Sequence, residues 1–130
     1  MNDVAATFLL TLDQNLAFYC TDLASKFLFN DYLQLTFDKG LVPLFFLVNF
    51  VLEQVDEELY QLVSDDDMLP TPIFTTSWIL TAFAHDIQKF DCVQRIYDLV
   101  LASHPLVIIY LVAAVIVEHK EELEEHAEEY

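Results

Sequence analysis

The segment that decides the fold is SWILTAFAHDIQKFDCVQRIYDLVLASHP, residues 77–105. Its second half has apolar side chains at i, i+3, i+4 and i+7, the spacing of one helix face. These are Val93, Ile96, Tyr97 and Val100. Its first half continues an apolar arc over about residues 72–87, typical of an interior helix, with Asp91 as a candidate N-cap for the helix that follows. The segment therefore predicts two adjoining helices, with Trp78 and Tyr97 buried between them.

Helical spacing extends through the rest of the chain. Two helices are expected before residue 30, where apolar residues recur at every fourth position from Val4. Residues 41–52 predict a helix buried on nearly all sides, a short helix follows the acids at 56–58, and a last helix covers 106 to about 125. With one Gly and four Pro among 130 residues, turn residues for a many-stranded sheet are scarce. We therefore expect a single all-α domain.

Charge and cysteine content limit the partners and the compartment. The chain has 22 Asp and Glu against five Lys and Arg, a net charge of −17. Binding to a phosphate backbone requires cationic contacts, so we expect no nucleic-acid partner. Cys20 and Cys92 lie in apolar helical surroundings, which predicts buried thiols in a reducing compartment. Asp3 is the first charged side chain, so a secretory signal is not expected and a cytoplasmic location is.

Two separated blocks of this sequence resemble the C-terminal part of a TBC domain, the helical module of Rab GTPase-activating proteins. The positions that carry the resemblance are Asn2, Asp3, Trp78, Phe83, Arg95, Tyr97 and Asp98. Tyr97 stands where the family's Arg-x-Trp-Asp has Trp. The resemblance implies that residues 1–120 form a helical array equivalent to the C-terminal part of that domain. Residues 121–130 would then be an acidic C-terminal tail.

The same resemblance implies a partner and a process. The partner would be a Rab-type small GTPase, and the process vesicle traffic at the cytosolic face of the endoplasmic reticulum or Golgi, with peripheral membrane association. The family's catalytic arginine and glutamine stand in I-x-x-D-x-x-R and Y-x-Q-G, which precede its M-N-D segment. Neither motif occurs in this sequence. We therefore expect no catalytic residue, no cofactor and no enzymatic activity.

Two residues are of the same types as the family's catalytic arginine and glutamine. Arg95 is the only arginine, but the nearest preceding acid is Asp91, so we interpret it as a helix-surface ion pair with Asp91 or Asp98. Gln34 lies in Tyr-Leu-Gln, which lacks the following glycine and comes after the M-N-D segment. With six tyrosines and six glutamines in the chain, we interpret that match as a coincidence.

Three clusters of polar residues suggest a metal site or a catalytic triad. They are His119, Glu122 and His126; Asp65, Asp66 and Asp67; and Ser77, His85 and Asp86. In the first cluster, Leu123 occupies the place of the second histidine of H-E-x-x-H. The second cluster lacks the glycine of a calcium loop, and the third lacks a nucleophile elbow. We expect neither a metal site nor a triad.

Two alternatives to a Rab regulator remain open. One is a helical module that binds a partner without catalysis. The other is a small membrane protein, because residues 99–117 contain no charged residue and approach the ~20 residues that span a bilayer. Against it, His104 and Pro105 interrupt that stretch, and no cluster of Lys or Arg flanks it.

Overall fold

The structure is a computed structural model that describes residues 2–32, 36–64 and 72–128, and within these ranges every regular element is a helix. The first elements are α1 (Asn2–Thr11), α2 (Gln14–Phe27), α3 (Phe37–Gly40), α4 (Val42–Val55) and α5 (Glu57–Ser64). A 3₁₀ turn, η1 (Ile73–Thr75), leads into α6 (Thr76–Thr81), α7 (Phe90–Ala102), α8 (Val107–Glu118) and α9 (Lys120–Glu128). The predicted all-α fold is confirmed.

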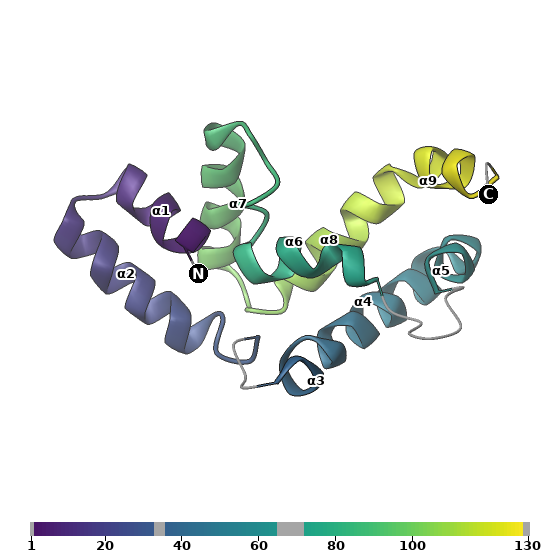
Figure 1. The fold of residues 1–130 in the computed structure, drawn as a ribbon, viewed down its shortest axis with the longest axis horizontal. Coiled ribbons are helices and arrows are strands. Elements are labelled where there is room, and N and C mark those ends of the chain that lie inside the picture. Colours follow the sequence, from purple (N-terminus) through teal and green to yellow (C-terminus); the bar gives the residue numbers. More distant parts are fainter. Residues whose placement is uncertain (1, 33–35, 65–71, 129–130) are drawn as a thin grey trace.

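The helices form a row of packed pairs (Figure 1). At one end α1 and α2 make an antiparallel hairpin, with α7 beside it. In the middle α4 lies against α8, which α6 also contacts. At the other end α9 lies against α5. Asp13 fixes the turn of the hairpin, because its carboxylate accepts hydrogen bonds from the backbone N–H groups of Asn15 and Leu16 at 3.0 and 3.3 Å and so caps α2.

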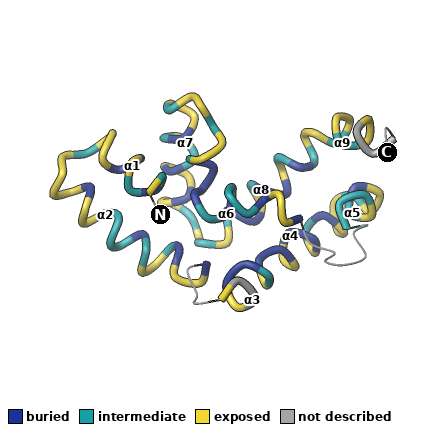
Figure 2. The backbone as a smooth tube through the Cα atoms, in the orientation of Figure 1, coloured by how far each residue is buried: buried dark blue, intermediate teal, exposed yellow. Residues whose placement is uncertain are grey.

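A large part of the core lies between α4 and α8, where the buried stretches of the two helices face each other (Figure 2). Their least exposed side chains are Phe45, Val48, Leu52, Ile108, Val112 and Ile116. The prediction that residues 41–52 are buried on nearly all sides is wrong. Phe46 and Phe50 are 56% and 61% exposed, because α8 covers only one side of α4.

The helix predicted to run through residue 87 ends earlier. α6 stops at Thr81, and the next two residues have positive φ, 46° at Ala82 and 65° at Phe83. Non-glycine residues avoid this left-handed region because the Cβ atom crowds the backbone. Burial offsets the strain, since Phe83 is buried and stacks on Trp78 with ring centroids 5.4 Å apart. The resulting reversal lets α7 return beside α1 and α6.

Tyr97 joins α7 to two other elements. Its ring meets that of Phe8 on α1 edge to face at 5.7 Å, and its hydroxyl donates a hydrogen bond to the Thr81 carbonyl at 2.9 Å. Burial raises the pKa of Tyr97 to about 12, and the negative charge of Asp3 acts in the same direction. The predicted burial of Tyr97 is confirmed. Trp78 is only partly buried, because it lies at the edge of the core against Phe83.

The predicted last helix is divided at His119, which ends α8 with φ −100° and ψ 20°. The bend brings the Lys120 ammonium to 2.7 Å from the Asp56 carboxylate, which also caps α5 by accepting from the Leu59 N–H. The hydrogen bond raises the pKa of Lys120 and lowers that of Asp56. The pair therefore stabilises the α5–α9 contact above the unfolded-state pKa of Asp56 and below that of Lys120. It weakens as pH falls through the lowered pKa of Asp56 or rises through the raised pKa of Lys120.

Residues 99–117, the membrane-spanning alternative, do not form a single helix. α7 ends at Ala102 and α8 begins at Val107, with His104 and Pro105 between them. In the described part of the chain, no helix combines the length and apolar character that crossing a bilayer requires.

Three smaller predictions are corrected. Cys92 is exposed and Cys20 only partly buried, because α7 and α2 each turn one side to solvent. Asp91 does not cap α7, since the helix begins one residue earlier, at Phe90, after Lys89. Asp91 instead lies in the first turn, where its charge is still favourable to the helix dipole.

The left-handed backbone at Ala82 makes a substitution series informative. Ala82→Val should lower the free energy of unfolding by about 2 kcal/mol or more, because a β-branched side chain clashes at positive φ and the site is fully buried. Ala82→Gly should stay within about 1 kcal/mol of the wild type, because relief of strain opposes the loss of the methyl group. Urea unfolding measures both, with Ala114→Val on the exposed face of α8 as the control. Equal effects of Val and Gly at position 82 would contradict the backbone assignment.

The raised pKa of Tyr97 predicts an alkaline loss of stability. The phenol is protonated below its unfolded pKa of about 10, so its contribution is complete there and disappears between pH 10 and 12. We expect Tyr97→Phe to lower stability at neutral pH by about 1 kcal/mol through the lost hydrogen bond, and to remove up to about 3 kcal/mol of the alkaline loss. Urea unfolding at pH 8, 10 and 11 tests this, with the exposed Tyr110→Phe as the control. A Tyr97→Phe variant with the wild-type pH dependence would exclude this role.

Candidate functional site

The two sequence blocks that resemble the TBC domain lie next to each other in the structure. Asn2 and Asp3 begin α1, and the Asp3 carboxylate lies 3.6 Å from Nδ1 of His85 in the turn after α6. Further along α1, Thr7 donates to the Asp3 carbonyl at 2.9 Å, and Phe8 contacts Tyr97 of α7. The start of α1 is therefore packed against both the reversal after α6 and the buried face of α7.

The other motif residues of α7 lie on its solvent side. Arg95 and Asp98 have side chains that are 86% and 73% exposed, and Arg95 Nη1 lies 3.9 Å from Asp98 Oδ2. This agrees with the interpretation of Arg95 as a surface ion pair. An exposed pair at this distance is worth at most about 1 kcal/mol. Within about one turn of α7, Tyr97 therefore packs in the core, whereas the side chains of Arg95 and Asp98 face solvent.

A cavity of about 480 Å³ lies between α7 and the α1–α2 hairpin. Phe8 of α1 and Leu12 just after that helix, together with Tyr97 and Leu101 of α7, provide its apolar surface. Its polar part comes from Thr7 and Thr11 of α1 and from one side of α7, which provides all of its charged groups, Asp91, Arg95 and Asp98, and Gln94. The Gln94 amide also donates to the Thr11 hydroxyl at 3.4 Å, which closes one edge of the cavity. A site of this size suits a side chain or a short peptide segment.

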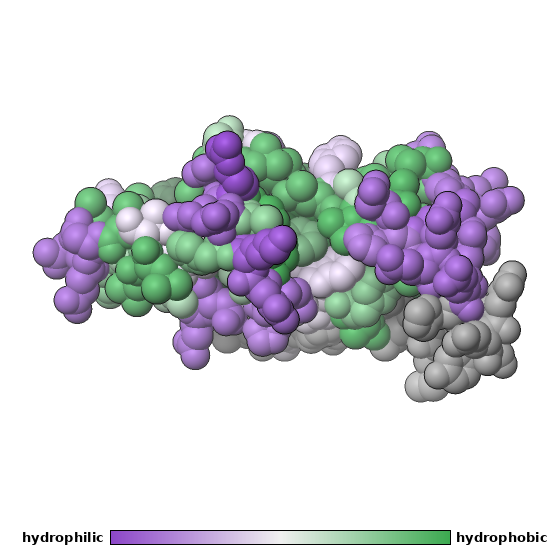
Figure 3. Space-filling view, turned by 90° about the horizontal axis from the view of Figure 1, so that it is seen from above, coloured by the Kyte–Doolittle hydropathy of each residue, from purple (hydrophilic) through white to green (hydrophobic). Residues whose placement is uncertain are grey.

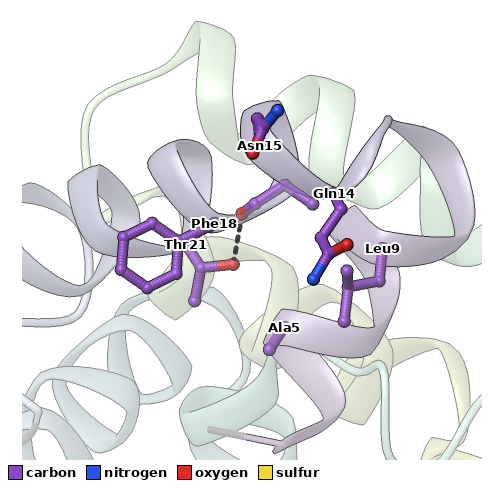
Figure 4. Close-up of a pocket in the computed structure, with 7 residues that line it drawn as sticks. Ala5, Leu9, Gln14, Asn15, Phe18 and Thr21 are labelled. Atoms are coloured by element: carbon purple, nitrogen blue, oxygen red, sulfur yellow. Dashed lines mark hydrogen bonds between the residues drawn. The ribbon is translucent and has the colours of Figure 1, made fainter.

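A second cavity, of about 390 Å³, lies within the α1–α2 hairpin (Figure 4). Ala5 and Leu9 of α1 face Gln14 and Phe18 of α2 across it. The Thr21 hydroxyl that borders it donates to the Ala17 carbonyl within α2 at 2.7 Å. No charged side chain lines this cavity, so it offers neither a general base nor an anion-binding group.

The polar clusters suggested by the sequence do not assemble in the part of the molecule that the structure describes. His85 has Asp3 as its carboxylate neighbour, so it is not oriented by Asp86 for a triad with Ser77. His119 Nδ1 lies 2.9 Å from the Val115 carbonyl, and no group of three potential metal ligands is found among the described residues. Gln34, residues 65–67 and the side chain of His126 lie outside that part.

The cavity between α7 and the hairpin is the feature that the sequence did not predict. Its walls come from residues about 80 to 90 positions apart, and helical periodicity does not say which helices meet. One signal was present. Leu101 adds an apolar side chain to the otherwise polar side of α7, outside the stripe of Val93, Tyr97 and Val100.

Comparison with known proteins identifies the relationship. The family model described as the Rab-GTPase-TBC domain matches residues 1–124. The relatives named TBC1 domain family member 20 from Bos taurus and Homo sapiens are 32% and 31% identical over 94% of this chain. GTPase-activating protein gyp10 from Schizosaccharomyces pombe is 30% identical over 92% of it. The chain spans about 30% of the length of these relatives, and no solved structure matches it.

These names correct one expectation. We expected a protein outside the catalytic classes, but a relative that covers nearly the whole chain is named a GTPase-activating protein, which places the family among catalytic activators. The expected helical array and the resemblance are confirmed by the family match and the helical fold. This chain belongs to the Rab-GTPase-TBC domain family.

Proposed function

We propose that this chain forms part of a Rab GTPase-activating protein and contacts a GTP-bound Rab during the regulation of vesicle traffic. The observation that carries the proposal is the family match over residues 1–124. The packing of α1 on α7 through Phe8 and Tyr97 supports it, because it joins the two sequence blocks that resemble the family in one structural unit. The division into a domain at 1–120 and an acidic tail at 121–130, and a place on the cytosolic face of the endoplasmic reticulum or Golgi, belong to the same proposal.

We further propose that the arginine and glutamine used in GTP hydrolysis are not among these 130 residues. An activating arginine must reach the charge on the transferred phosphoryl group. Arg95 lies beside Asp98 and four residues after Asp91, so two negative charges on the same helix oppose the approach of a phosphate. The family positions Asn2, Asp3, Trp78, Tyr97 and Asp98 then have structural roles.

Single-turnover hydrolysis by a panel of GTP-loaded Rabs tests the role of Arg95. We expect Arg95→Ala to leave the hydrolysis rate within about twofold of that with the unaltered chain, because an arginine finger is worth about 10³ to 10⁵ in rate and a surface ion pair contributes none of it. Lys89→Ala, which removes another exposed cation close to α7, is the matched control. An extended polypeptide carrying I-x-x-D-x-x-R and Y-x-Q-G should accelerate hydrolysis.

Two results would contradict the proposal in different ways. Acceleration by the 130-residue chain that disappears in Arg95→Ala, but not in Lys89→Ala, would make Arg95 a catalytic residue. Failure of both the chain and the extended polypeptide to bind or activate any GTP-loaded Rab would refute the proposed function itself.

A further inference from the structure

The cavity between α7 and the hairpin continues into a neighbouring one. A further cavity of about 240 Å³ is lined by residues of α1, α2 and α7. It shares Phe8, Cys20 and Leu101 with the cavity of about 480 Å³. The two are therefore parts of one trough between α7 and the α1–α2 hairpin, which we call the hairpin groove.

The hairpin groove is apolar along much of its length and open to solvent. Phe8 and Tyr97 form its buried floor, whereas Leu101 and Phe27 on its walls are 51% and 71% exposed. On the face seen in Figure 3, hydrophobic surface lies between hydrophilic regions, one of which covers the end that carries α9. Exposed apolar side chains around a concave site favour the binding of an apolar partner surface.

The α7 wall of the hairpin groove carries a net negative charge, because two carboxylates and one guanidinium line it. Asp91 and Asp98 are seven residues apart on α7, so they lie on the same face about 10 Å apart. Among the described residues that line the groove, Arg95 is the only cation, and it is 86% exposed beside Asp98. The net charge of −17 for the whole chain adds a long-range attraction for cations. A partner seated here gains from positive charge beside its apolar residues.

We propose that the hairpin groove binds an amphipathic helical segment of a partner protein that carries lysine or arginine beside an apolar stripe. The stripe would contact Phe8, Tyr97 and Leu101, and the cations would face Asp91 and Asp98. Anchors at i, i+3 or i+4, and i+7 of such a helix extend over about 10 Å, which matches the spacing of the two carboxylates. The same net charge opposes a second copy of this chain and an anionic lipid surface as occupants. This binding function is additional to GTPase activation.

Fluorescence anisotropy with two designed peptides tests the proposal. The probe is a fluorescein-labelled helical peptide of about 15 residues with a leucine stripe flanked by lysines. The comparison peptide has the same sequence with every lysine replaced by glutamate. We expect the 130-residue chain to bind the lysine probe at least about tenfold more tightly than the glutamate probe. Added salt should reduce this difference.

Variants locate the binding. Leu101→Asp should weaken binding of the lysine probe at least about tenfold, because it places a charge against the apolar stripe. Asp91→Asn with Asp98→Asn should weaken it severalfold and reduce its salt dependence. Phe50→Asp, which alters an exposed apolar residue on α4, is the matched control and should bind as the wild type does. Circular dichroism verifies that each variant keeps its helical content.

Several outcomes would overturn the proposal. These are absence of binding, equal affinity for the two probes, and equal effects of Leu101→Asp and Phe50→Asp. Sedimentation equilibrium adds another readout, because a dimer that is lost only in Leu101→Asp would show that a second copy occupies the groove instead. Loss of Rab binding with intact probe binding would leave this proposal standing and refute only the proposed function.

Discussion

The hydrogen bond from the Tyr97 hydroxyl to the Thr81 carbonyl, at 2.9 Å, holds together the elements on which the rest of the structure depends. Thr81 ends α6, and its hydroxyl donates to the Ser77 carbonyl while accepting from the His85 N–H. The chain therefore reverses direction at a point where both the carbonyl and the hydroxyl of Thr81 are hydrogen-bonded. With the Tyr97 ring packed on Phe8, this point also fixes α1 against α7.

The cost of the reversal explains why an aromatic cluster surrounds it. Two consecutive left-handed residues, Ala82 and Phe83, are unfavourable by about 1–2 kcal/mol each. Phe83 compensates by burial and by stacking on Trp78, which in turn meets Phe74 edge to face at 5.7 Å. Trp78 and Phe83, two aromatic residues of the TBC resemblance, thus stabilise a left-handed backbone turn that contains no glycine.

Separation of buried and exposed faces on α7 connects the fold to the two proposed functions. The helix directs Tyr97 into the core and leaves Asp91, Arg95 and Asp98 at the solvent edge of the hairpin groove. Within residues 95–98, Tyr97 therefore contributes to the stability of the fold, whereas Arg95 and Asp98 contribute to the charge of the surface. The family's activity requires an arginine free to meet a phosphate, and this arginine lies among carboxylates. The carboxylates of Asp91 and Asp98 instead agree with the proposed binding of a cationic helix at the same surface.

The sequence by itself determined the helical class, the approximate positions of the helices and the family. These follow from local information: apolar spacing at 3.6 residues, scarce glycine and proline, and motif residues that are close neighbours within each block. Only the tertiary structure decided where helices break, as at Ala82 and His119, and which apolar residues stay exposed, such as Phe46 and Phe50. It also decided that α1 and α7 enclose a groove. These features depend on contacts between distant segments, such as Lys120 with Asp56 and Tyr97 with Thr81, and helical periodicity within one segment contains no information about them.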